Sequence, residues 1–208
     1  MKICGVTRLG DAERAAEFGA WAVGMVLHAE SPRLCPLPEA ERIAAALRRR
    51  VELAGVFVNA PLDELVRTSE GLALTLVQLH GDEGPAYCAE VARRTGARVI
   101  KALPISGVGS LRELRRFKTD FHLLDGYSPG LRGGGGRSFD WSLAAQRRSR
   151  VPAIVGGGLN PDNVAEAIAA TEPYAVDVAS GVESAPGIKD EERLRSFFDA
   201  ARGAVPAS

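Results

Sequence analysis

The segment AIVGGGLNPDNVAEAIAATEPYAVDVASG, residues 153–181, contains one full repeat of the pattern that decides the fold. A short apolar run, Ala153–Gly157, is followed by a stretch of helical periodicity that begins near Pro161 and by a second apolar run, Ala175–Ala179. Strand, helix and strand in this order are typical of a βαβ unit, in which the two strands are parallel.

The same alternation of apolar runs and amphipathic stretches continues toward both ends of the chain. Eight expected strands lie at Lys2–Gly5, Ala22–Leu27, Leu53–Val58, Leu76–His80, Val99–Leu103, Phe121–Asp125, Ala153–Gly157 and Ala175–Ala179. The helices expected after them lie at Asp11–Phe18, Pro38–Arg49, Leu62–Glu70, Pro85–Thr95, Leu111–Phe117, Phe139–Arg147, Pro161–Ala170 and Glu191–Ala201.

Eight such units can close into a barrel or form an open, doubly wound sheet. The pattern has no spare strand and no GxGxxG motif after the first strand, which favours the barrel. The chain of 208 residues also lies near the lower limit of about 200 for this fold, which argues against a second domain. We therefore predict an α/β fold, a single-domain (β/α)8 TIM barrel over residues 1–208.

Charge and cysteine content exclude several classes of function. The 26 basic and 26 acidic side chains balance, so no overall field draws the chain to nucleic acid or to an anionic membrane. No apolar run approaches the roughly 18 residues of a membrane span. The three cysteines, Cys4, Cys35 and Cys88, are too widely spaced for a disulfide framework or a zinc site. We expect a cytoplasmic protein with neither a nucleic-acid nor a membrane partner.

Cys4 is the first candidate for chemistry, because the active site of a TIM barrel lies at the C-terminal ends of its strands. Alternation of side chains along the first strand should point Lys2 and Cys4 to the same side, into the barrel. A nearby ammonium would favour the thiolate, the form that can accept a proton. Cys4 could equally be a small buried apolar residue without a chemical role. That interpretation is preferred for Cys35 and Cys88.

Asp125 is the second candidate, since it ends the apolar run Phe121–Leu124. A carboxyl group in a dry site can hold its proton and act as a general acid, whereas a structural aspartate would be held by loop amides. The alternation of side chains also points Lys2, Lys101 and Asp177 into the barrel, where we expect the charges to be paired. Lys101 could instead form a Schiff base at the end of its strand.

Two glycine-bearing loops indicate a phosphorylated ligand. Gly156-Gly157-Gly158 follows the seventh expected strand and leads into a helix that should begin at Asn160-Pro161, and Ser180-Gly181 follows the eighth. Backbone N–H groups of such loops can approach an anion closely, and in TIM barrels these two loops often bind phosphate. Arg33, in the loop after the second strand, could grip a carboxylate with two parallel hydrogen bonds, although a surface arginine there is the more common case.

Short strings along the whole chain resemble phosphoribosylanthranilate isomerases of tryptophan biosynthesis. They are KICGVT (2–7), SPR (31–33), GVFVN (55–59), VQLHG (77–81), FDW (139–141), GGLNPDNV (157–164), DVASGVE (177–183) and PGIKD (186–190). They occur in the expected order, with one on almost every βα unit.

The resemblance implies an Amadori rearrangement that needs neither a metal nor another cofactor. It implies that Cys4 is the general base and Asp125 the general acid. It further implies that Arg33 binds the anthranilate carboxylate, and that the loops with Gly157, Gly158, Ser180 and Gly181 hold the ribose phosphate. Members of the family occur as monomers and as homodimers, so either state is expected here.

The chain departs from the family pattern in two places. The family often has GGTG before FDW, whereas this chain has Gly133–Gly136 followed by Arg137-Ser138. An all-glycine loop of this kind could act as a mobile cover. The family also tends to have two serines before GVE, and here Ala179 replaces the first. Phosphate binding would then depend on Ser180 and on backbone amides.

Three other functions are open to such a barrel. A barrel similar to indole-glycerol-phosphate synthase would use a lysine such as Lys101, but no inward glutamate is found on the early strands. A sugar-phosphate epimerase would need metal ligands, and His80 alone at a strand end is normally structural. A barrel that only binds a phosphorylated ligand would not need Cys4 or Asp125.

Overall fold

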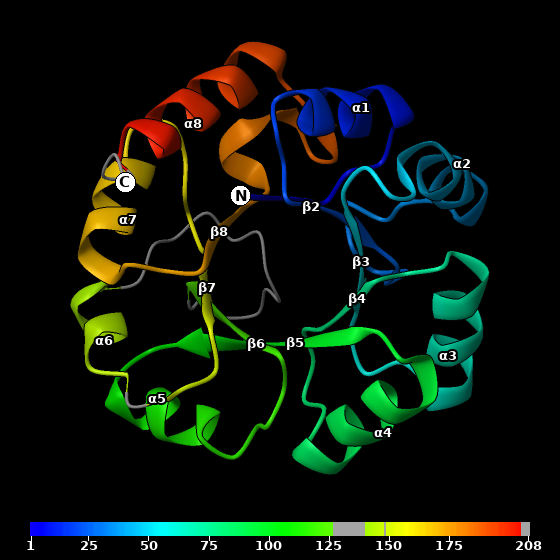
Figure 1. The fold of residues 1–208 in the computed structure, drawn as a ribbon, viewed down its shortest axis with the longest axis horizontal. Coiled ribbons are helices and arrows are strands. Elements are labelled where there is room, and N and C mark those ends of the chain that lie inside the picture. The colour runs from blue at the N-terminus through cyan, green and yellow to red at the C-terminus, as the bar shows by residue number, and fades with distance from the viewer. Residues whose placement is uncertain (127–139, 148, 205–208) are drawn as a thin grey trace.

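The computed structural model describes residues 1–126, 140–147 and 149–204, and it is a closed barrel of eight parallel strands surrounded by helices (Figure 1). The barrel strands are β1 (Lys2–Cys4), β2 (Ala22–Val26), β3 (Glu52–Phe57), β4 (Leu76–Leu79), β5 (Arg98–Ile105), β6 (Phe121–Gly126), β7 (Ala153–Val155) and β8 (Ala175–Val178). Each strand pairs in parallel with its neighbours in the sequence, and β1 pairs with β8 to close the ring. The predicted (β/α)8 barrel is confirmed.

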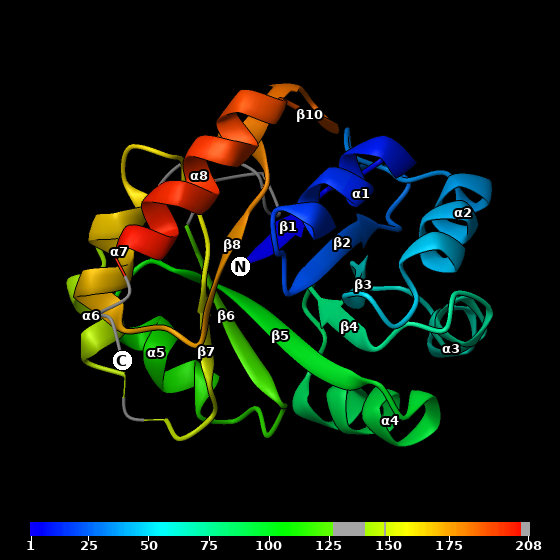
Figure 2. The ribbon, with the colours of Figure 1, turned by 45° about the horizontal axis from the view of Figure 1, so that its top comes forward.

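The helices lie outside the ring of strands, as Figures 1 and 2 show. They are α1 (Leu9–Glu17), α2 (Leu37–Leu47), α3 (Leu62–Gly71), α4 (Pro85–Thr95), α5 (Val108–Leu114), α6 (Ser142–Ala145), α7 (Val164–Thr171) and α8 (Glu191–Gly203). After β8 come a short 3-10 helix, η1 (Ser180–Val182), and a small antiparallel pair, β9 (Glu183–Ala185) and β10 (Ile188–Lys189). In the described part of the chain, every helix is too short or too polar to span a membrane.

Three helices differ from the sequence-based expectation by three residues at one end or both. The helix expected at Leu111–Phe117 is α5, which begins and ends three residues earlier, at Val108 and Leu114. The helix expected from Pro161 begins only at Val164, because the side chains before it form a separate turn. In that turn Asn163 Oδ1 accepts a hydrogen bond from the Asn160 N–H at 2.9 Å, and Asn160 Oδ1 accepts one from the Asp162 N–H at 2.8 Å. The helix expected at Phe139–Arg147 is limited to α6 in the described part of the chain. The Gly133–Gly136 loop lies outside the described residues.

Apolar side chains cover both faces of the barrel strands, as parallel sheets require. The inner group is small and contains Ala22, Ala54, Leu76, Ile100, Ala102, Phe121, Leu123, Ile154 and Ala175. The larger outer group fills the space between strands and helices, with residues such as Ile3, Val77, Val99 and Phe197. At the N-terminal ends of the strands, the rings of Trp21, Phe121 and Tyr174 pack edge-on or tilted, with centroids 5.0–5.5 Å apart.

The charged strand residues divide between the two faces. Lys2 and Asp177 are opposite each other in the β1–β8 register and form an ion pair at 2.7 Å, as the expectation of paired inward charges requires. The expectation that Lys101 points inward is wrong. Its neighbours on β5, Ile100 and Ala102, belong to the inner apolar group, so Lys101 points outward toward the helices. The apolar residues on both sides of β5 had left the direction of Lys101 undefined.

Lys101 forms a buried network that fixes the loop after β4. Its Nζ donates to Glu83 Oε2 at 2.7 Å and to the Gly81 carbonyl at 2.7 Å. Glu83 in turn accepts hydrogen bonds from the backbone N–H groups of Asn59 and Gly81, both at 2.8 Å. Both charged side chains are 2% exposed. The network therefore satisfies two buried charges and holds the loops after β3 and β4 together.

We expect Lys101→Met to lower the free energy of unfolding by about 3–5 kcal/mol, because it leaves the Glu83 carboxylate buried without its cation. The matched control is Arg116→Met, which breaks an exposed pair with Glu113 and should cost less than about 1 kcal/mol. Urea unfolding of both variants measures the difference. Equal, small losses in the two variants would show that the Lys101–Glu83 pair does not stabilise these loops.

Candidate active site

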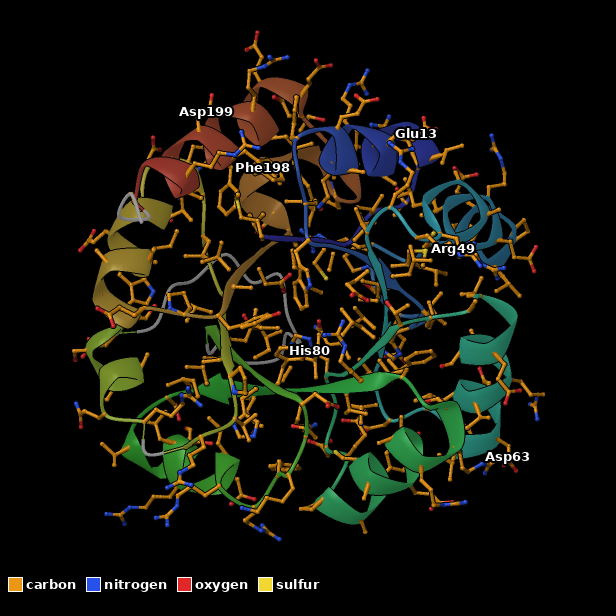
Figure 3. All side chains as sticks on the ribbon, viewed as in Figure 1. Glu13, Arg49, Asp63, His80, Phe198 and Asp199 are labelled. Atoms are coloured by element: carbon orange, nitrogen blue, oxygen red, sulfur yellow. The ribbon has the colours of Figure 1, made fainter. Side chains whose placement is uncertain are left out.

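One pocket opens at the C-terminal ends of the strands, where the active site of this fold is expected. The predicted site residues that line it are Cys4, Arg33, Asp125, Gly157, Gly158 and Ser180. Other residues that line it include Gln78, His80 and Asp177. In Figure 3 His80 lies inside the ring of strands, whereas Glu13, Asp63 and Asp199 lie on the outer helices. The structure thus brings together residues from β1, β4, β6, β8 and the loops after β2 and β7.

Cys4 is 7% exposed and faces the barrel interior near the Lys2–Asp177 ion pair. Gly24 on β2 provides the space for it, because a Cβ on Gly24 would lie 2.9 Å from Cys4 Sγ and 3.2 Å from Lys2 Nζ. Burial raises the pKa of the Cys4 thiol above its ordinary value, and the ammonium of Lys2 only partly opposes this. Lys2 thus favours the thiolate, as expected, but burial of the thiol and the nearby Asp177 carboxylate act in the opposite direction and keep the pKa of Cys4 raised.

Asp125 is 7% exposed and is held by two hydrogen bonds. Its Oδ1 accepts from the Gly126 N–H at 2.9 Å, and its Oδ2 lies 3.1 Å from His80 Nε2. The other ring nitrogen of His80, Nδ1, lies 3.0 Å from Gln78 Nε2. The interpretation of His80 as merely structural overlooked this contact. Strand periodicity could have indicated that His80 enters the pocket. Leu76, Gln78 and His80 are every second residue, so their side chains share one face, and that face points inward.

Arg33 belongs to a buried ionic network that the sequence did not reveal. Its Nε and Nη2 donate to the Glu183 carboxylate at 2.9 and 2.8 Å. Lys189 Nζ donates to the same carboxylate at 2.8 Å and to the Cys4 carbonyl at 2.6 Å. Burial alone would raise the pKa of Glu183, but Arg33 and Lys189 lower it below its usual value. Glu183 and Lys189 stand in the GVE and PGIKD strings, yet nothing in those strings indicated which residues they contact.

The position of Arg33 depends on a glycine beneath it. Gly5 has φ +69°, and a Cβ there would lie 2.7 Å from Arg33 Cδ. The Arg33 side chain is 13% exposed and lines the pocket. Glu183 takes the Nε side of the guanidinium, and among the described residues no hydrogen bond uses Nη1. The Nη1 edge therefore remains available to a ligand.

The two glycine-bearing loops approach each other at the same pocket. Gly157 and Gly158 both have positive φ, +78° and +66°, and among the described residues no hydrogen bond uses their N–H groups. Ser180 opens η1 and lines the pocket beside them. Gly181 does not line the pocket. A Cβ on Gly181 would lie 1.9 Å from the Leu159 carbonyl oxygen, so glycine there permits the close approach of the two loops.

The geometry suits acid–base chemistry on an anionic ligand. Cys4 on β1 and Asp125 on β6 face the same pocket from well-separated strands of the ring. Arg33 and the N–H groups of Gly157 and Gly158, which bond to no other described residue, offer two sites for negative charge.

Known proteins of one family are similar to this chain over nearly its full length. The family model of N-(5'-phosphoribosyl)anthranilate (PRA) isomerase matches residues 1–200. The N-(5'-phosphoribosyl)anthranilate isomerase of Geobacter metallireducens is 46% identical over 202 residues, which cover 97% of this chain and 98% of the relative.

Two solved structures are also similar. The crystal structure of phosphoribosyl anthranilate isomerase from Thermus thermophilus is 38% identical, has a TM-score of 0.88, and covers 97% of this chain and 98% of its own. A second phosphoribosyl anthranilate isomerase was solved in complex with reduced 1-(o-carboxyphenylamino)-1-deoxyribulose 5-phosphate. It is 38% identical, has a TM-score of 0.85, and covers 97% of each chain. This chain therefore belongs to the N-(5'-phosphoribosyl)anthranilate isomerase family.

Proposed function

We propose that this chain catalyses the Amadori rearrangement of N-(5'-phosphoribosyl)anthranilate to 1-(2-carboxyphenylamino)-1-deoxyribulose 5-phosphate. One observation carries the proposal: an inward thiol, Cys4, and an inward carboxyl, Asp125, line the same pocket. The family match supports the choice of substrate. A cytoplasmic location and a monomeric or homodimeric state remain predictions from the sequence.

The reaction starts with proton transfer from Asp125. Asp125, in its protonated form, gives its proton to the furanose ring oxygen, and the bond between C1′ and that oxygen breaks to leave a Schiff base. The Cys4 thiolate then removes the proton from C2′, and the electron pair of that C–H bond moves to form an enolamine. The enolamine tautomerises to the ketone, so that the substrate's atoms are only rearranged. The two residues must hold opposite protonation states at one pH.

Charge on the substrate orients it between these two groups. The free Nη1 edge of Arg33 binds the anthranilate carboxylate, while Glu183 holds the Nε side. The N–H groups of Gly157 and Gly158, with Ser180, bind the phosphate, and Gly181 lets the second loop approach the first. Anchoring both ends places the reacting carbon between acid and base.

Two alternatives are less well supported. A Schiff-base enzyme similar to indole-glycerol-phosphate synthase would need Lys101 in the pocket, but its ammonium is buried outside the barrel wall against Glu83. A barrel that only binds its ligand would show no dependence of turnover on Cys4, and the variant below tests that.

We expect Cys4→Ala to lower kcat by about 100-fold or more, because general base catalysis typically contributes 10²–10⁴-fold. KM should change little, since Arg33 and the glycine loops remain in place. The measurement follows the fluorescence of phosphoribosylanthranilate as it is consumed. Cys88→Ala, a buried cysteine on α4, is the control and should keep near-wild-type kcat. Near-full kcat in Cys4→Ala would remove Cys4 from the mechanism.

The raised pKa of Cys4 also predicts a pH dependence. The Cys4 thiol must lose its proton while Asp125 keeps its own, so the pH profile of kcat/KM should contain an apparent pKa above the ordinary thiol value of about 8.5. Cys4→Asp replaces the thiol by a carboxyl group, whose ordinary pKa is about 3.9, and should remove this apparent pKa from the alkaline range. Superimposable pH profiles for the wild type and Cys4→Asp would show that another group sets it.

A further inference from the structure

His80 links two buried polar side chains that lie on different strands. Gln78 lies on the inward face of β4, and His80, the residue directly after β4, continues that face. Asp125 lies at the end of the inward face of β6. The ring of His80 lies between them, with Nδ1 3.0 Å from Gln78 Nε2 and Nε2 3.1 Å from Asp125 Oδ2. The three side chains therefore form a continuous chain of hydrogen bonds that ends at the proposed acid.

The amide of Gln78 determines which ring nitrogen carries the hydrogen. Gln78 is 1% exposed, and its Oε1 has no hydrogen-bond partner among the described residues. The amide nitrogen, which faces Nδ1, can only donate, and an ionised Asp125 carboxylate at the other end of the ring can only accept. Gln78 therefore donates to Nδ1. His80 then carries its hydrogen on Nε2 and donates it to Asp125 Oδ2.

The backbone at His80 is held by the network beneath it. The His80 N–H donates to the Phe57 carbonyl at 2.9 Å. The next residue, Gly81, is bonded through its N–H to Glu83 and through its carbonyl to Lys101. The buried ion pair between Lys101 and Glu83 thus fixes the point from which the His80 ring reaches Asp125.

We propose that His80 is a positioning residue for Asp125, and that Gln78 sets the tautomer in which it acts. This inference rests on the proposed function. His80 Nε2–H keeps its hydrogen bond to Oδ2 whether Asp125 is protonated or ionised, which leaves Oδ1 to carry the proton that is given to the sugar. When that proton leaves, the same bond stabilises the new carboxylate. No proton passes through His80 itself.

Kinetics of two His80 variants separate this role from a structural one. We expect His80→Ala to lower kcat by roughly 10–100-fold, the effect of losing a hydrogen bond to a charged group, with little change in KM. His80→Gln should recover most of the loss, because its amide N–H can take the place of Nε2–H. Thermal unfolding checks that both variants are folded. Wild-type kcat in folded His80→Ala would overturn the proposal, as would equal losses in the two variants.

Nitrogen NMR of the histidine ring gives a readout that does not depend on activity. Protonated and unprotonated ring nitrogens have distinct ¹⁵N shifts, and the chain has only three histidines to assign. We expect hydrogen on Nε2 of His80 in the wild type, and a shift of the population toward Nδ1–H in Gln78→Leu together with a lower kcat. Hydrogen on Nδ1 in the wild type, or an unchanged tautomer in Gln78→Leu, would overturn the proposal.

Asp125→Asn distinguishes failure of this inference from failure of the proposed function. Loss of turnover in Asp125→Asn with full turnover in His80→Ala would reject the role of His80 alone. Full turnover in Asp125→Asn would reject the proposed acid, and with it the role of His80.

Discussion

The ion pair between Lys2 and Asp177 lies where the first and last strands meet, inside the barrel and beside Cys4. Two charges taken out of water need each other, because the loss of either leaves the other uncompensated. A shift in the register between β1 and β8 would separate the two charges and is therefore unfavourable. Figure 2 shows these two strands side by side. It also sets the surroundings of the thiol: the cation favours the thiolate, while the carboxylate and burial oppose it.

Two further buried ionic networks hold the rest of the site. Glu183 binds both Arg33 and Lys189, and Lys189 reaches back to the carbonyl of Cys4. The Lys101–Glu83 pair fixes the loop that carries His80. Each network uses side chains from distant parts of the chain to fix a polar group at the mouth of the barrel. Since such groups are costly to leave unpaired, the networks oppose any rearrangement of the polar groups that they hold.

The sequence predicted the barrel and most of the pocket, because these depend on local periodicity and on the rule that strand ends form the site. Cys4, Asp125 and the glycine loops follow from position along a strand. The contacts that side chains make with residues on other strands and loops do not follow from position along a strand. The direction of Lys101 was wrong because β5 is apolar on both faces, and His80 and Glu183 were missed because their partners are 45 and 150 residues away. The burial that raises the pKa of Cys4 depends on packing across the barrel, which the sequence alone does not reveal.

The central claim is that one ligand lies between Cys4 and Asp125 with its two anionic ends fixed. A crystal structure of this chain with reduced 1-(o-carboxyphenylamino)-1-deoxyribulose 5-phosphate tests it most directly. The account predicts the phosphate on the N–H groups of Gly157 and Gly158, the carboxylate on Arg33, and C2′ within about 3–3.5 Å of Cys4 Sγ. A ligand bound with C2′ far from Cys4, or with its phosphate away from the glycine loops, would contradict it.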